Sequence, residues 1–148
     1  MQYIFKVTRA EKDASANRSA ISPASAGINL GDVLTAAVPR IRELSPSTLD
    51  NVVRCFENVH FDQHENILVE GDPGEEAFVL LVGKVQIAIN GKVIRMLSKP
   101  GTLLGEKALF DDKHSVGATV TAVDGEASLM RLRQADFRSA LSRVNARP

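Results

Sequence analysis

The stretch that decides the fold reads Leu103-Leu104-Gly105-Glu106-Lys107-Ala108-Leu109-Phe110. It places a glycine in front of a helix-forming run, inside a series of segments that otherwise have the pattern of strands. A short helix that begins at Gly105 points its free backbone N–H groups at whatever lies before it, and such groups suit an anion. We call residues 103–110 the cassette. Taken alone, this pattern is a weak sign of a ligand site.

Short apolar runs separated by turn residues surround the cassette. Residues 77–82 form a continuous apolar run that predicts a buried strand, and residues 85–89 alternate between apolar and polar side chains. Asn90-Gly91 predicts a hairpin, because both positions of its turn need a positive φ. After the cassette, residues 119–123 and 127–132 predict two more strands, separated by a turn at Asp124-Gly125.

Helices are expected only at the two ends of this strand series. Asp32 is a candidate N-cap for a first short helix. Ser45 before Pro46 matches the preferred N-cap and first helical position, and it predicts a second helix that ends at residues 60–61. A last helix begins at Asp136. The fold class is therefore predicted as α+β: an eight-stranded β-roll or jelly-roll barrel with flanking N- and C-terminal helices and a short cassette helix.

The domain organisation follows from a change in composition near residue 30. Residues 10–27 are rich in alanine and serine and show neither a helical stripe nor a strand alternation. We therefore expect residues 1–29 to be a disordered or linker segment. Residues 30–148 are expected to form one domain, with the β-roll at about 59–133.

Charge and composition exclude several classes of function. Eighteen basic and eighteen acidic side chains give a formal net charge of zero, which argues against a nucleic-acid partner. No apolar stretch approaches the roughly 20 residues that a membrane span needs. Cys55 is the only cysteine, so no internal disulfide forms. Without a signal peptide, this favours a reducing compartment, and we expect the cytoplasm.

The order of these motifs resembles the cyclic-nucleotide-binding domain in the regulatory parts of cAMP- and cGMP-dependent protein kinases. The similarity runs from about residue 41 to residue 144. Residues 71–78 resemble the family's first turn and the strand that follows it, and Gly83-Lys84-Val85 resembles its next turn. Residues 105–109, followed by 118–120, resemble its phosphate-binding cassette. The resemblance implies a non-catalytic regulatory module of a cyclic-nucleotide-dependent protein kinase, such as a cGMP-dependent kinase. Its implied partners are neighbouring regulatory or kinase domains of the parent protein.

The resemblance also implies a ligand pocket. Glu106 stands at the family's glutamate, which accepts a hydrogen bond from the ribose 2′-hydroxyl, and the backbone amides around residues 107–109 contact the phosphate and ribose. The implied pocket residues are Gly105, Glu106, Lys107, Ala108, Leu109, Val116, Gly117 and Ala118.

The sequence departs from the family where the cyclic phosphate is held. The family's arginine, three positions before Thr119, is replaced by Val116, and the usual proline before it by Ser115. Gly117 replaces the threonine or serine of cGMP-selective members. A lost charge-assisted contact costs about 1.5–3 kcal/mol, or roughly a tenfold to hundredfold or greater loss of affinity. We therefore expect a degenerate pocket that binds cAMP or cGMP weakly or not at all.

Three alternatives stay open at this point. Lys107, Lys113 and His114 are candidates to replace the missing charge, but the favoured interpretation of these residues is a solvated loop beside Asp111 and Asp112. A neutral phosphate region also suits an uncharged ligand such as a nucleoside, with Glu106 holding the ribose hydroxyls. A β-roll metal enzyme is disfavoured, because His60, His64 and His114 have no partner ligands at metal spacing; no catalytic residue and no metal ligand are assigned.

Overall fold

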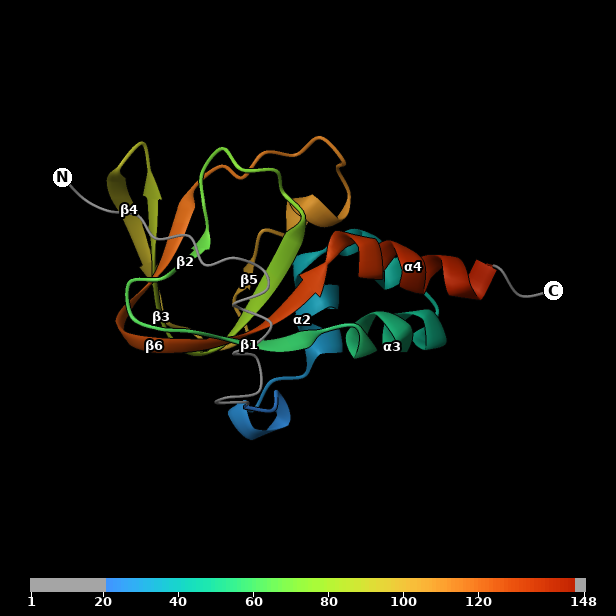
Figure 1. Cartoon of the computed structure of the whole chain (residues 1–148). Coiled ribbons are helices and arrows are strands. Elements are labelled where there is room, and N and C mark those ends of the chain that lie inside the picture. The colour runs from blue at the N-terminus through green and yellow to red at the C-terminus, as the bar shows by residue number, and fades with distance from the viewer. Residues whose placement is uncertain (1–20, 146–148) are drawn as a thin grey trace.

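The computed structural model describes residues 21–145, with side chains for residues 21–142. A small β-roll carries helices at one end, and the hairpin that contains β4 lies at the other (Figure 1). The elements, in chain order, are η1 (Ala24–Ala26), α2 (Leu30–Ala37), η2 (Pro39–Glu43), α3 (Pro46–Arg54), β1 (Glu57–Phe61), β2 (Asn66–Leu68), β3 (Glu76–Ile89), β4 (Lys92–Leu97), β5 (Leu103–Leu104), η3 (Glu106–Leu109), β6 (Thr119–Arg133) and α4 (Gln134–Asn145).

Two long antiparallel strands, β3 and β6, form the centre of the sheet. The strand order is β1-β6-β3-β4, with β2 pairing with β6 and β5 with β3. The ladder between β3 and β6 shifts register on either side of Val82, where residues 124–127 of β6 lie opposite Gly83 alone. Gly83 has a φ of 114°, and a Cβ there would lie 2.7 Å from the carbonyl oxygen of Glu126. The β3–β6 ladder is therefore irregular at a point where the two backbones lie close together.

The α+β β-roll with flanking helices and a short cassette helix is confirmed, but the count of eight strands is not. Residues 21–145 contain six strands. The breaks predicted at Gly83-Lys84 and Asp124-Gly125 are irregularities within continuous strands, because the β3–β6 ladder resumes beyond them. By contrast, the Asn90-Gly91 hairpin is confirmed: the two φ angles are 52° and 77°, and β3 pairs with β4 across the turn.

Alternation along β3 divides the buried side chains into two cores. Ala77, Val79 and Leu81 face the helices and pack in the cluster that also holds Phe137 of α4. The intervening Phe78 and Leu80 face the interior of the roll and pack with a second cluster. Both faces of β3 are therefore buried over residues 77–81, which explains the apolar run there. Val82, the last residue of the predicted run, is 47% exposed.

The structure confirms the predicted start of α3 but corrects the N-cap of α2 and the end of α3. The side chain of Asn29, not of Asp32, caps α2, and its oxygen accepts from the Asp32 N–H at 3.0 Å. Ser45 caps α3 as predicted. However, α3 ends at Arg54 instead of extending to residues 60–61, because the chain there pairs with β6 as strand β1. No helix in residues 21–145 is long and apolar enough to cross a membrane.

The segment expected to be a linker falls partly outside the described residues, since residues 1–20 are not described. Residues 21–29 include the short turn η1, and Ile21, Ala26 and Ile28 pack against the helical core. The backbone N–H of Ile21 also donates to the side-chain oxygen of Asn58 in β1 at 3.4 Å. This stretch is therefore fixed to the domain through apolar contacts and through β1.

Replacing Gly83 by alanine tests the close approach at the bend. Gly125 is the matched control, because its φ is 123° and a Cβ there meets no atom within 4 Å. We expect Gly125→Ala to lose about 1–3 kcal/mol of unfolding free energy from backbone strain alone. Gly83→Ala should lose about 1–3 kcal/mol more, because its Cβ also overlaps the β6 backbone. Urea unfolding measures both values, and equal losses would contradict the proposed close contact.

Candidate functional site

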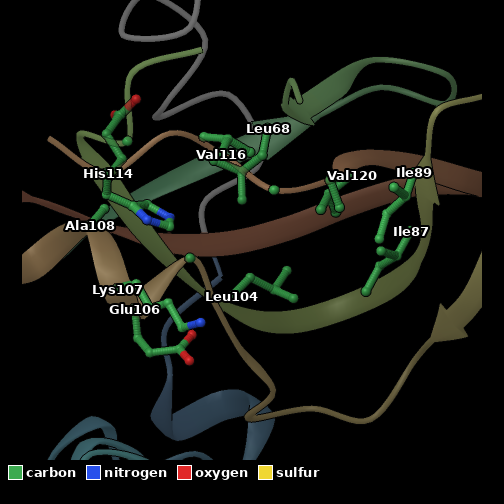
Figure 2. A pocket seen from close by; sticks show the side chains of 15 residues that line it. Leu68, Ile87, Ile89, Leu104, Glu106, Lys107, Ala108, His114, Val116 and Val120 are labelled. Atoms are coloured by element: carbon green, nitrogen blue, oxygen red, sulfur yellow. The ribbon is translucent and has the colours of Figure 1, made fainter. Parts of the chain in front are cut away.

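A cavity of about 350 Å³ lies between the cassette, β3 and the segment that leads into β6, a size typical of small-molecule sites. Figure 2 shows Ile87, Ile89 and Val120 at one end of it and Glu106, Lys107 and His114 at the other. The cavity thus has an apolar end and a polar end. Its lining residues are Leu68, Gly74, Glu76, Ile87, Ile89, Leu104, Gly105, Glu106, Lys107, Ala108, His114, Val116, Gly117, Ala118 and Val120.

Seven of the eight pocket residues predicted from the sequence line this cavity, and Leu109 does not. The cassette folds as one 3₁₀ turn, η3, whose preceding residue Gly105 has a φ of 72°. A Cβ at Gly105 would lie 3.0 Å from the Glu76 carbonyl oxygen, so the cassette rests directly on β3. Ala108 faces the cavity, whereas Leu109 is buried in the helical core.

Val116 is held in place by a short antiparallel pairing that the sequence did not reveal. The N–H of Gly71 donates to the Val116 carbonyl oxygen at 2.8 Å, and the Val116 N–H donates to the Asp72 carbonyl oxygen at 2.9 Å. The N–H of Gly74 donates to the His114 carbonyl oxygen at 2.7 Å. The turn at residues 71–74 therefore fixes the backbone of residues 114–116, and Val116 and His114 both reach the cavity.

Two of the three candidates for a replacement charge line the cavity, and the third does not. Lys107 and His114 line the cavity, and Figure 2 shows the imidazole ring of His114 turned towards it. This ring lies against Gly74, where a Cβ would be 2.6 Å from the ring carbon Cδ2. Lys113 does not line the cavity. Its side chain is exposed, in a loop where its N–H donates to a carboxylate oxygen of Asp111 at 2.9 Å.

A buried arginine lies behind the cavity wall. Arg131 of β6 is 3% exposed, and its Nε lies 3.3 Å from a carboxylate oxygen of Glu76, a lining residue. Its Nη2 lies 3.4 Å from a carboxylate oxygen of Glu57. Two carboxylates therefore already balance this guanidinium, and it is not among the lining residues.

Sequence reasoning missed the apolar wall of the cavity. Leu68, Ile87, Ile89 and Val120 come from three strands that the sequence does not align with one another. The alternation of residues 85, 87 and 89 was a usable signal, because side chains two apart share one face of a strand. The sequence alone does not give the register that pairs β6 with β3, and so it does not show that Val120 lies near Ile87.

The cassette is also tied to the last helix. The side-chain amide of Gln134, the first residue of α4, donates to the Ala108 carbonyl oxygen at 2.5 Å and to that of Asp111 at 3.3 Å. Arg138 of α4 forms an ion pair with Asp112. The rings of Phe110 and Phe137 meet edge to face, with centroids 5.4 Å apart.

Comparisons with known proteins agree with this architecture. The family model described as cyclic nucleotide-binding domain matches residues 58–144. A cGMP-dependent protein kinase of Drosophila melanogaster, isozyme 2 forms cD5/T2, is 32% identical over 101 residues, which cover 64% of this chain and 11% of the kinase. A cyclic nucleotide-gated potassium channel of Mesorhizobium japonicum is 33% identical over 109 residues, which cover 74% of this chain and 29% of the channel.

A solved structure shares the fold as well. A cyclic nucleotide-binding-like protein from Brucella abortus has a TM-score of 0.66 at 22% identity, over 76% of this chain and 97% of that one. The curated relatives are much longer than this chain, so the kinase and channel matches concern one part of each protein. On the family match, which extends from β1 into α4, this chain belongs to the cyclic nucleotide-binding domain family.

Proposed function

We propose that this chain is a non-catalytic regulatory module whose pocket binds cAMP and cGMP weakly or not at all. The observation that supports this most is the side chain at position 116. There, the resemblance to the family implies an arginine for the cyclic phosphate, and this chain places a valine on the cavity wall. The module keeps the fold of a cyclic-nucleotide pocket without the cation that the ligand needs.

The remaining charges of the cavity are poorly suited to a phosphodiester. Glu76 and Glu106 are the acidic lining residues, and a cyclic phosphate would add a third negative charge to them. Arg131 balances Glu76 from behind, whereas Lys107 is exposed and its ammonium is free to remain in solvent. Like charges that share a site disfavour the charged form of each. The cavity therefore supports a neutral or weakly bound occupant better than a cyclic nucleotide.

The helices are the proposed route by which such a module acts. The relatives include cGMP-dependent protein kinases matched over a small part of their length. We place this chain in the regulatory part of a kinase of that type, where α2, α3 and α4 contact neighbouring regulatory or kinase domains. A pocket without its ligand gives no population shift of its own, so the module acts as a structural relay.

A second candidate function rests on the apolar end of the cavity. Ile87, Ile89 and Val120 provide a surface for a planar base, and the Glu106 carboxylate at the other end can accept hydrogen bonds from ribose hydroxyls. An uncharged nucleoside would satisfy both ends without a phosphate. This candidate makes the module a sensor of altered specificity.

The proposal is tested first by Val116→Arg. Restoring the cation should strengthen cAMP or cGMP binding by roughly tenfold to more than a hundredfold, because a charge-assisted contact is worth about 1.5–3 kcal/mol. Calorimetric titration of the whole chain measures this change. Val116→Gln is the matched control, since it adds reach without charge and should bind no better than the wild type. Micromolar or tighter binding of a cyclic nucleotide by the wild type would overturn the proposal.

A second prediction separates the candidate replacement charges. Any residual cyclic-nucleotide binding should fall on His114→Gln, because His114 lines the cavity. Lys113→Gln should leave the affinity unchanged, because that side chain lies in the exposed loop outside the cavity. The same titration compares the two variants. If Lys113→Gln caused the larger loss, the assignment of the cavity's polar end would be wrong.

A third prediction distinguishes the relay from the nucleoside sensor. Adenosine, guanosine and inosine are titrated into the wild type and into Glu106→Gln. The relay predicts no heat from any of them. The sensor predicts binding by the wild type that weakens in Glu106→Gln, since an amide oxygen is a poorer acceptor than a carboxylate. Binding that Glu106→Gln leaves unchanged would place the nucleoside somewhere other than this cavity.

A further inference from the structure

Three potential metal ligands meet on one face of the β1–β6 pair, outside the cavity. In the antiparallel register, His60 lies opposite Ser128 and Phe61 opposite Ala127. Asp62 directly follows Phe61 and Glu126 directly precedes Ala127, so both lie at the end of this pairing. Residues two apart on a strand, and residues directly opposite across a pair, share one face. The β1–β6 pairing therefore brings Glu126 next to His60 and Asp62, from which it lies far away in the sequence.

The distances between their ligand atoms match a tetrahedral ion. His60 Nε2 lies 3.3 Å from Asp62 Oδ1 and 3.5 Å from Glu126 Oε1. One ligand atom from each of the three residues lies within 4.8 Å of the others. Zinc binds imidazole nitrogen and carboxylate oxygen at about 2.0–2.2 Å, so two ligands at the tetrahedral angle are about 3.4 Å apart. The separations of His60 from the two carboxylates are therefore those expected for ligands of one ion.

Burial and charge favour a cation at this place. The His60 side chain is 3% exposed, so its orientation is set by the fold. The carboxylates of Asp62 and Glu126 are 54% and 66% exposed, which leaves the site open to solvent on one side. Two carboxylates that lie close together repel each other. A divalent cation between the two carboxylates removes that repulsion.

We propose that His60, Asp62 and Glu126 bind a divalent metal ion of the zinc type, with water completing the coordination. Imidazole selects zinc and its transition-metal neighbours, whereas magnesium and calcium prefer oxygen ligands alone. The ion joins the end of β1 to the bend of β6, so its binding stabilises the folded state. None of the three ligands lines the cavity, and the site is independent of the proposed function.

The experiment titrates Zn²⁺ into the whole, chelator-treated chain by calorimetry and follows thermal unfolding with Zn²⁺, Mg²⁺ or EDTA. We expect one Zn²⁺ per chain and a higher Tm in Zn²⁺ than in EDTA, with no rise in Mg²⁺. Asp62→Asn and Glu126→Gln should each weaken Zn²⁺ binding at least about tenfold, since even groups behind the ligands affect affinity by about 10–100-fold. Both side chains are exposed, so these variants avoid the buried His60, and their Tm in EDTA checks folding.

His64→Asn is the matched control for adventitious binding to a surface histidine. His64 lies in the same turn, is exposed and has a φ of 74°, a conformation that asparagine tolerates. It should bind Zn²⁺ like the wild type. The proposal is overturned if the wild type binds no Zn²⁺, or if His64→Asn loses as much affinity as Glu126→Gln. It is also overturned if Mg²⁺ raises the Tm as Zn²⁺ does, because the imidazole then plays no part.

Discussion

The close backbone contact between β3 and β6 at Gly83 is the constraint on which the rest of the molecule depends. It bends both strands while the ladder continues on either side. One half of β3 is then covered by helices on one face and by the roll on the other. The second half carries Ile87 and Ile89 to the cavity. On β6, the same bend lies beside Glu126, opposite the end of β1. The cavity and the proposed metal site therefore both depend on the close contact between β3 and β6.

Local chemistry explains what the sequence could predict. Ser45-Pro46 and Asn90-Gly91 determine their own backbone conformation, so the α3 start and the hairpin follow from a few adjacent residues. The family resemblance indicated the order of the strands and identified seven of the fifteen residues that line the cavity. The N-cap of α2 was a local failure, since Asn29 and not Asp32 fills that position. The other failures depended on partners distant in sequence. The number of strands depends on the register between β3 and β6. The burial of Leu109 away from the cavity depends on the position of the helical core. The proximity of Glu126 to His60 depends on the pairing of β1 with β6.

Arg131 and position 116 differ in what they contribute: one stabilises the fold, and the other faces the cavity. Arg131 is almost fully enclosed, and Glu57 and Glu76 both pair with it. Removing one partner of such a group costs several kcal/mol, because a charge is left buried without compensation. The buried positive charge behind the cavity wall therefore stabilises the fold and is already paired with two carboxylates. At position 116, by contrast, the side chain meets the cavity and its backbone alone is held, so the fold accepts valine there.

The attachment of the cassette to α4 has a mechanical consequence. Gln134 holds the Ala108 and Asp111 carbonyls, and Arg138 holds Asp112. The edge-to-face contact of Phe110 with the buried Phe137 adds an apolar contact to this linkage. A displacement of α4 therefore reaches the floor of the cavity through these side chains, as well as reaching the sheet through the direct chain connection from β6 to α4.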